Sequence, residues 1–181
     1  ERRRTLDTHR LLSLVPIHLH HVVADIGCGP GYFTIPLGKY LFDGNVFALD
    51  VQQEMLDALK ERLDHVHLGN VEAIRSTERK LPIDKDILDG ALIAFVLHEV
   101  AGKEAFLKEV LSHLRPSGWV AMLEWYKKEM DEGPPLEERI EEEEVITIAE
   151  KVGLKLVSRR DLNGKQYMLL LKKSKVGSPV S

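Results

Sequence analysis

Three closely spaced glycines are the residues of this sequence best suited to approach a ligand. Gly27, Gly29 and Gly31 follow the short apolar run 22–26 and precede a segment with helical spacing. Glycines between a strand and a helix let the backbone come close to a bound molecule, and the first amides of the helix are free to donate to it. Residues 27–31 are therefore a candidate turn for binding a nucleotide-like cofactor.

Two aspartates accompany this turn. The dinucleotide-binding turn has the spacing G-x-G-x-x-G, whereas here the glycines alternate and Asp25 lies two residues before the first of them. Asp50 closes the next apolar run, at a position where a carboxylate can accept hydrogen bonds from both hydroxyls of a ribose. The pattern favours a ribose-containing cofactor other than a dinucleotide, although Asp50 could also cap the helix that follows.

The elements that must position these residues alternate between apolar runs and amphipathic segments, which is typical of a sheet with crossover helices. The chain predicts strands at 22–26, 45–49, 66–68, 90–95, 119–124, 154–160 and 166–172, and helices at 32–41, 55–63, 103–115 and 136–151. Residues 69–80 are interpreted as a short helix with a loop. Asn163-Gly164 is a strong hairpin signal, so the α/β fold is expected to end in an antiparallel pair.

The whole-chain properties limit the possible classes of protein. With 181 residues, 44% hydrophobic and 30% charged, we expect one globular domain, with a helical flank or lid at 1–20, a core at 21–173 and a tail at 174–181. No apolar run approaches the roughly 20 residues of a membrane span. A net charge of −4 makes a nucleic acid partner unexpected. The single cysteine, Cys28, fits a cytoplasmic protein, and the oligomeric state stays open.

Several motifs occur in the order and spacing of one family. Residues 23–31 resemble the first motif of class I S-adenosylmethionine-dependent methyltransferases, particularly the type 11 group that includes the ubiquinone/menaquinone C-methyltransferases. Residues 48–50 resemble the family's ribose-binding acidic motif, and 69–73 its Gly-Asp-Ala-Glu segment. Residues 88–100 are similar to the fourth-strand motif, and 114–119 to the turn before the fifth strand.

This resemblance implies a Rossmann-like three-layer sandwich with a mostly parallel seven-stranded sheet in the order 3-2-1-4-5-7-6, strand 7 being antiparallel. It also implies S-adenosylmethionine as cofactor and S-adenosylhomocysteine as product. Met55 is expected to pack against adenine, with Asn70 near the adenine amino group and the Val71 amide near the ring, although Asn70 replaces the family's aspartate. The full set of expected cofactor contacts is Asp25, Gly27, Cys28, Gly29, Gly31, Tyr32, Phe33, Asp50, Val51, Met55, Asn70, Val71, Glu72, Ala94 and Phe95.

The methyl acceptor should bind beyond the carboxyl ends of the strands, as ligands do in such sheets. His98 and Glu99 follow the fourth strand, while Glu124, Trp125 and Tyr126 follow the fifth, so these residues are candidates for the acceptor pocket. His98 could equally be a structural histidine, and the two aromatic side chains could simply pack in the core. No catalytic base is assigned, because in-line orientation supplies much of the rate enhancement.

The predicted function is transfer of the cofactor's methyl group to a small molecule. Methylation of protein or nucleic acid is an alternative, which would call for a basic groove with aromatic side chains. A non-catalytic domain that binds S-adenosylmethionine or S-adenosylhomocysteine is another. No metal site is expected, since His18, His20 and His21 have no cysteine or paired carboxylate nearby.

Overall fold

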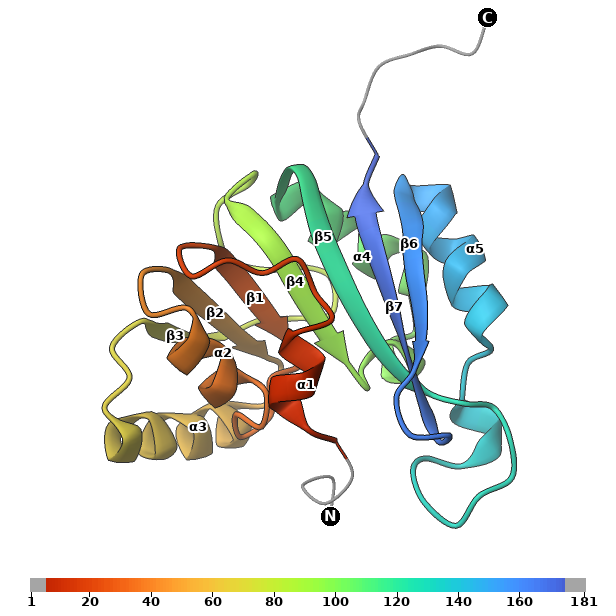
Figure 1. Cartoon of the computed structure of the whole chain (residues 1–181), viewed down its shortest axis with the longest axis horizontal. Helices are drawn as coiled ribbons and strands as arrows, with labels where there is room; N and C mark the ends of the chain where they lie inside the picture. Colours follow the sequence, from red (N-terminus) through yellow and green to blue (C-terminus); the bar gives the residue numbers. More distant parts are fainter. Residues whose placement is uncertain (1–5, 175–181) are drawn as a thin grey trace, which may run out of the picture.

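The computed structural model describes residues 6–174, so residues 1–5 of the expected flank and 175–181 of the expected tail lie outside the described residues. The strands are β1 (Val22–Ile26), β2 (Asn45–Asp50), β3 (Val71–Arg75), β4 (Leu88–Ala94), β5 (Leu114–Trp125), β6 (Leu154–Asp161) and β7 (Gln166–Lys173). They form one sheet in the order β3-β2-β1-β4-β5-β7-β6, with β7 antiparallel to both neighbours and the other pairs parallel (Figure 1). The predicted topology is confirmed.

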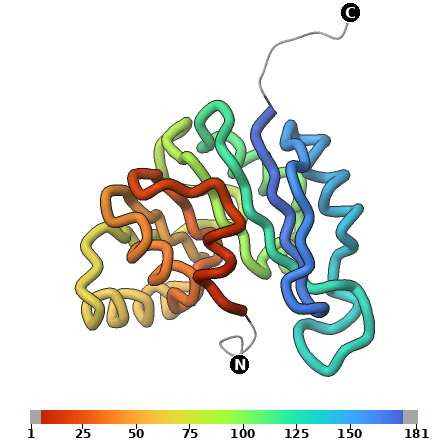
Figure 2. The backbone as a smooth tube through the Cα atoms, in the orientation of Figure 1, coloured from red at the N-terminus to blue at the C-terminus, as the bar shows by residue number. Residues whose placement is uncertain are grey.

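Helices cover both faces of this sheet. They are α1 (Thr8–Leu12), α2 (Thr34–Tyr40), α3 (Gln53–Val66), α4 (Lys103–His113) and α5 (Glu142–Val152), with single 3-10 turns η2 (Leu97–Glu99) and η3 (Leu136–Glu138). α1, α2 and α3 lie against one face, whereas α4 and α5 lie against the other (Figures 1 and 2). The three-layer sandwich is therefore confirmed. Within residues 6–174, no helix is long and apolar enough to cross a bilayer.

The central strands are apolar on both faces because each face meets a helical layer. Ile93 and Met122 belong to the core on the α4–α5 side, while their neighbours Leu92 and Leu123 belong to the core on the α1–α2 side. This alternation is the period of two expected of a strand. It explains why the central strands appear in the sequence as continuous apolar runs.

The third strand is not where the sequence pattern placed it. β3 spans Val71–Arg75, so the predictions of a strand at 66–68 and of a helix within 69–80 were wrong. α3 continues to Val66 and ends at His67, which is left-handed (φ 52°) and donates its N–H to the helix's last carbonyls. Leu68 donates to the Leu63 carbonyl at 3.3 Å and packs against the α3 core. The apolar signal at 66–68 thus comes from a helix C-cap.

Two other boundaries differ from the prediction in ways that bear on function. α5 begins at Glu142, and residues 136–138, predicted to be helical, form only the turn η3. β5 begins at Leu114 and contains a bulge, because Leu88 pairs with Leu114 but Gly90 pairs with Trp119. A Cβ on Gly90 would lie 2.0 Å from the Trp119 ring, so only glycine allows the indole to lie on this strand.

The predicted hairpin between β6 and β7 is confirmed in detail. Gly164 has a positive φ of 73°, and its N–H donates to Asp161 Oδ1 at 2.6 Å. Asn163 Oδ1 accepts hydrogen bonds from the N–H groups of Lys165 and Gln166. Short polar side chains thus satisfy the turn's own backbone, which is why this feature could be predicted locally.

Candidate functional site

The glycine turn lies at the carboxyl ends of β1 and β2. All three glycines have positive φ, at 71°, 52° and 91° for Gly27, Gly29 and Gly31. A Cβ on Gly27 would lie 2.2 Å from Val96 Cγ2, and one on Gly31 2.5 Å from Leu59 Cδ1. A Cβ on Gly29 would meet no atom within 4 Å. Packing therefore requires glycine at the first and third positions, whereas Gly29 borders open space that a ligand can occupy.

Asp50 connects this turn to the end of β2. Its Oδ2 accepts the Gly29 N–H at 2.8 Å, and its Oδ1 accepts the Gln52 N–H at 2.9 Å. Gln52, and not Asp50, is the N-cap residue of α3. Each carboxylate oxygen can accept a second hydrogen bond, so Asp50 keeps the capacity to bind two hydroxyl groups.

Asp25 is buried beneath the same turn. It is 1% exposed, and its Oδ2 accepts a 2.6 Å hydrogen bond from the Thr34 hydroxyl. Burial raises the pKa of Asp25 from 3.8 to about 7; the Thr34 bond opposes this shift and the charge of Asp50 adds to it. Asp25 therefore titrates near neutral pH, and a cationic ligand group nearby would hold it ionised.

The side chain of Cys28 fills space in this turn. The residue is 6% exposed and packs with Leu56 and Leu59 of α3. Burial, followed by the charges of Asp25 and Asp50, raises the pKa of the Cys28 thiol. A neutral buried thiol is inert, so only the backbone of Cys28 is suited to contact a ligand.

A cavity of about 500 Å³ lies beyond the carboxyl ends of β2 and β3, next to Asp50. It is lined by Val51, Arg75, Ser76, Thr77 and Glu78. This volume is within the usual range for a small-ligand site. The residues after β3 were missed in the sequence because the polar stretch 69–80 was interpreted as a short helix with a loop.

Asn70, Val71 and Glu72 lie at the opposite edge of the sheet from this cavity. Val71 begins β3 and pairs with Val46 at the start of β2, so these residues are at the amino end of the strand. The Asn70 side chain donates to the carbonyls of Gly38 and Leu41, at 3.0 and 2.7 Å. The expectation that these three residues contact the cofactor required them at the carboxyl edge, because the strand was predicted at 66–68; the structure places them at the amino edge instead.

The other expected cofactor residues lie around the glycine turn or at the carboxyl edge of the sheet. Val51 is 45% exposed at the cavity and Met55 is partly buried on α3. Tyr32 and Phe33 pack edge to face, with 4.8 Å between ring centroids. Ala94 ends β4, and Phe95 leaves it with a positive φ of 61°.

Among the acceptor-pocket candidates, the structure brings His98 and Glu124 together. The His98 N–H donates to Glu124 Oε1 at 3.2 Å, and its ring Nδ1 lies 2.8 Å from Glu124 Oε2. Both side chains are at most 3% exposed, whereas that of Glu99, with Oε1 3.7 Å from His98 Nε2, is 66% exposed. The buried pair is suited to holding the turn after β4 in place.

Tyr126 packs against Tyr167, with 5.2 Å between ring centroids. Burial raises the pKa of Tyr126, and the negative charges of Asp161 and Glu142 add to this. Its hydroxyl is therefore neutral at physiological pH.

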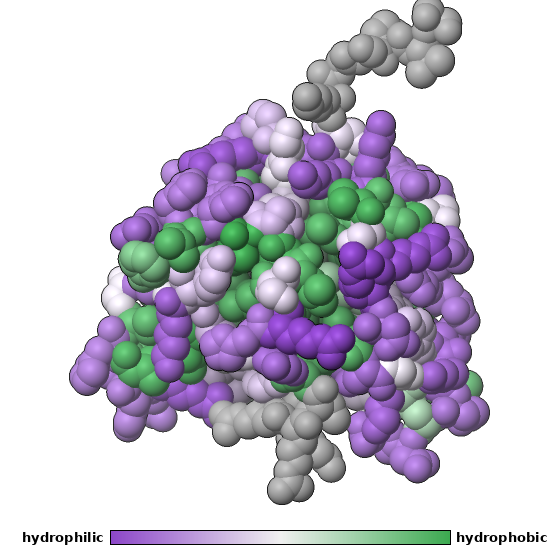
Figure 3. Space-filling model, in the orientation of Figure 1, coloured by the Kyte–Doolittle hydropathy of each residue, from purple (hydrophilic) through white to green (hydrophobic). Residues whose placement is uncertain are grey.

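Aromatic side chains form an apolar wall at the same edge of the sheet. The rings of Phe95 and Trp125 are 5.7 Å apart, and both belong to the core on the α1–α2 side. Leu6 and Met130 pack against the same core from the N-terminal flank and from the loop after β5. Figure 3 shows the face of the molecule on the α1–α2 side, where hydrophobic residues lie across the middle and hydrophilic residues surround them.

Arg139 holds the loop after β5, and sequence reasoning missed it because it lies within an acidic stretch. The residue is 5% exposed, and its guanidinium donates to four backbone carbonyls, those of Tyr126, Lys128, Glu132 and Pro134. A Cβ on Gly133 would lie 2.7 Å from the Trp125 ring, so the loop rests directly on this aromatic side chain. Arg139 thereby fixes one border of the apolar wall.

Comparisons with known proteins agree with this geometry. Residues 23–118 match the family described as "Methyltransferase domain". A SAM-dependent methyltransferase from Aquifex aeolicus has a TM-score of 0.88 and 30% identity, covering 94% of this chain and 92% of that one. A putative type 11 methyltransferase from Sulfolobus solfataricus has a TM-score of 0.71 and 25% identity, covering 87% of each chain.

Curated relatives share part of their length with this chain. The ubiquinone/menaquinone biosynthesis C-methyltransferase UbiE of Azotobacter vinelandii is 33% identical over 126 residues, which is 66% of this chain and 50% of that protein. The demethylmenaquinone methyltransferase of Bacillus mycoides is 34% identical over 119 residues, 65% of this chain and 49% of that protein. The chain thus matches about half the length of these relatives.

Proposed function

This chain belongs to the S-adenosylmethionine-dependent methyltransferases of the methyltransferase-domain family, and on that basis we propose that it transfers the cofactor's methyl group to a small, largely apolar acceptor. The observation that carries the proposal is the joint placement of the open space beside Gly29 and the Asp50 carboxylate at one edge of the sheet. The relatives named as a ubiquinone/menaquinone biosynthesis C-methyltransferase and a demethylmenaquinone methyltransferase support a small-molecule acceptor.

The residues around the turn fit the chemical groups of this cofactor. Asp50 can accept hydrogen bonds from the ribose hydroxyls, and the cavity at Val51 and Ser76 has room for the adenine. The backbone at Gly27 and Gly29 lets the methionine portion approach, and an ionised Asp25 would favour its cationic groups. When bound, the cofactor supplies a methyl group on a sulfonium, already activated for displacement.

The chain's own contribution is to orient the acceptor and to exclude water. Phe95 and Trp125 place buried aromatic rings beside the proposed position of an apolar acceptor, and the loop held by Arg139 closes one side. The Tyr32 hydroxyl donates to the Leu6 carbonyl at 2.6 Å, which ties the N-terminal flank to the cofactor turn. We therefore assign the described part of this flank, with α1, the role of a cover over the site. Orientation of this kind can lower a barrier by about 7–11 kcal/mol.

Calorimetry tests the cofactor assignment. S-adenosylhomocysteine should bind, and Asp50→Ala should abolish binding because the carboxylate is lost from the ribose position. Asp43→Ala, which removes an exposed carboxylate in the loop before β2, is the matched control and should leave binding unchanged. Preference for NAD over S-adenosylhomocysteine would refute the assignment.

A transfer assay with labelled methyl donor tests the acceptor class. A metabolite extract should yield labelled products of low mass, and a reduced naphthoquinone lacking its ring methyl group is a suitable single probe. Labelling confined to protein or nucleic acid would overturn the small-molecule assignment. Binding of S-adenosylhomocysteine with no transfer to any extract would instead indicate a binding domain.

A further inference from the structure

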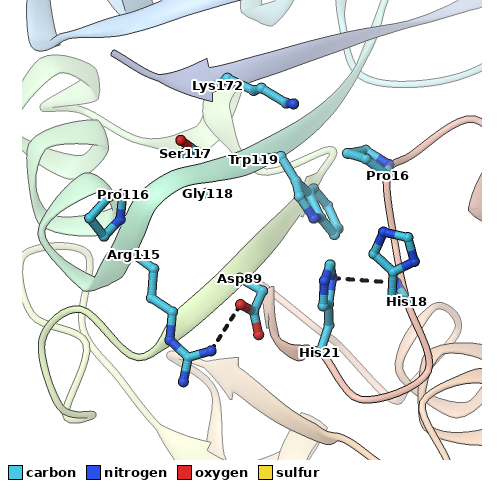
Figure 4. A pocket seen from close by; sticks show the side chains of 10 residues that line it. All are labelled: Pro16, His18, His21, Asp89, Arg115, Pro116, Ser117, Gly118, Trp119 and Lys172. Atoms are coloured by element: carbon cyan, nitrogen blue, oxygen red, sulfur yellow. Dashed lines mark hydrogen bonds and ion pairs between the residues drawn. The ribbon is translucent and has the colours of Figure 1, made fainter. Parts of the chain in front are cut away.

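A second polar pocket lies at the amino ends of β1, β4 and β5, at the opposite edge of the sheet from the glycine turn (Figure 4). Its volume is about 220 Å³. The walls come from the segment before β1, from Asp89 of β4, from residues 115–119 of β5 and from Lys172 of β7. None of the residues assigned to methyl transfer takes part in it.

Positive charge exceeds negative charge in this pocket. Asp89 is its one carboxylate among the lining residues, and both oxygens are engaged, by Arg115 Nη1 at 2.9 Å and by the Val22 N–H at 2.8 Å. Arg115 is 48% exposed at its side chain and keeps further N–H donors. Within residues 6–174, the ammonium group of Lys172 has no hydrogen-bond or ion-pair partner. The pocket thus holds two cationic side chains and one carboxylate, and both oxygens of that carboxylate already accept hydrogen bonds.

Imidazole and indole groups complete the lining. The rings of His18 and His21 pack edge to face, with centroids 4.8 Å apart, and stand with Trp119 on the side opposite Arg115 (Figure 4). The indole N–H of Trp119 is buried and has no hydrogen-bond partner within the described residues. Buried N–H groups are almost always paired, so this N–H is an unsatisfied donor on a side chain that lines the pocket.

The bulge in β5 builds one side of the pocket. Between the pairs Leu88–Leu114 and Gly90–Trp119, β5 has the four residues 115–118 where β4 has only Asp89, and Arg115 and Ser117 among them are exposed. Ser117 has a positive φ of 65°, which is unusual for a residue other than glycine. Bulges of this kind commonly redirect side chains towards a site.

From these observations we propose that the pocket binds a small oxyanion of the phosphate class, at a site separate from methyl transfer. Guanidinium, ammonium, hydroxyl and imidazole groups are the donors that recognise phosphate oxygens in proteins. The lining offers all four, while the carboxylate that could repel an anion is neutralised by Arg115. Because the pocket and the glycine turn lie at opposite edges of the sheet, both can be occupied at once.

The test is a titration of inorganic phosphate into the full chain, with and without saturating S-adenosylhomocysteine. The indole N–H resonance of Trp119, identified by its loss in Trp119→Phe, should shift in a saturable way, and that of Trp125 should not. The Kd for phosphate should be the same with and without S-adenosylhomocysteine. Acetate should bind at least about tenfold more weakly, since one carboxylate uses fewer of the donors.

Exposed residues make suitable variants, since their loss leaves the core intact. Arg115→Gln and Lys172→Gln should each weaken phosphate binding about tenfold, as expected for one charge-assisted contact. Lys155→Gln is the matched control, because Lys155 is an exposed lysine that pairs with Lys172 across β6 and β7. Absence of saturation, equal binding of acetate, displacement by S-adenosylhomocysteine or an equal effect of Lys155→Gln would each overturn the proposal.

Discussion

The buried Asp25 makes the stability of the fold depend on pH in a way that one substitution can isolate. Its pKa is 3.8 ordinarily and about 7 in the folded chain, so the folded state holds this proton more tightly than the unfolded state does. The protonated carboxyl therefore contributes its full share to the free energy of unfolding below about pH 4, and this contribution is lost as the pH rises through about 7. At 1.36 kcal/mol per pKa unit, ionising Asp25 costs on the order of 4 kcal/mol in total.

Asp25→Asn replaces the carboxyl with a neutral amide that still accepts the Thr34 hydrogen bond. Urea denaturation across the range from about pH 5 to 9 should show the variant gaining a few kcal/mol relative to the parent chain as the pH rises. Asp43→Asn, at an exposed carboxylate, should follow the parent chain throughout. Parallel pH curves for the parent chain and Asp25→Asn would refute the reasoning. The same variant should bind S-adenosylhomocysteine more weakly, because it cannot carry the charge that favours a cationic ligand.

Four further substitutions separate packing from binding. Gly27→Ala should lower the free energy of unfolding by about 2–4 kcal/mol, since its Cβ would overlap Val96. Gly29→Ala should cost only about 1 kcal/mol of backbone strain, yet it should prevent S-adenosylhomocysteine binding. Equal losses of stability for the two variants in denaturation would contradict this. Arg139→Met should raise the KM for the acceptor about tenfold and leave the Kd for S-adenosylhomocysteine unchanged, because only the loop after β5 loses its anchor. A tenfold rise in that Kd as well would contradict a role confined to the acceptor side. Glu124→Gln should cost about 1–3 kcal/mol of stability, because one of the two oxygens that face His98 becomes an NH2 group, which cannot accept a hydrogen bond. An unchanged Tm would show that the pair does not hold the turn.

The sequence by itself determined the features whose signals are local. The run 22–26, the alternating glycines and Asp50 predicted a strand, a cofactor turn and an acidic end to the second strand, and each lies where expected. Asn163-Gly164 likewise predicted the hairpin. These features depend on backbone conformations that neighbouring residues impose, so a short stretch of sequence is enough to specify them.

Only the tertiary structure decided which edge of the sheet each residue joins. The register of β3 against β2 placed Asn70 at the amino edge and Ser76 at the carboxyl edge, a choice that residues 66–80 alone did not reveal. The same holds for the contact between His98 and Glu124, which are 26 residues apart, and for the burial of Arg139 among backbone carbonyls. Such contacts depend on how strands and loops distant in sequence pack together. A short apolar stretch has the same local pattern whether it folds as a helix cap or as a strand, and an acidic stretch has the same pattern whether it forms a helix or an anchored loop.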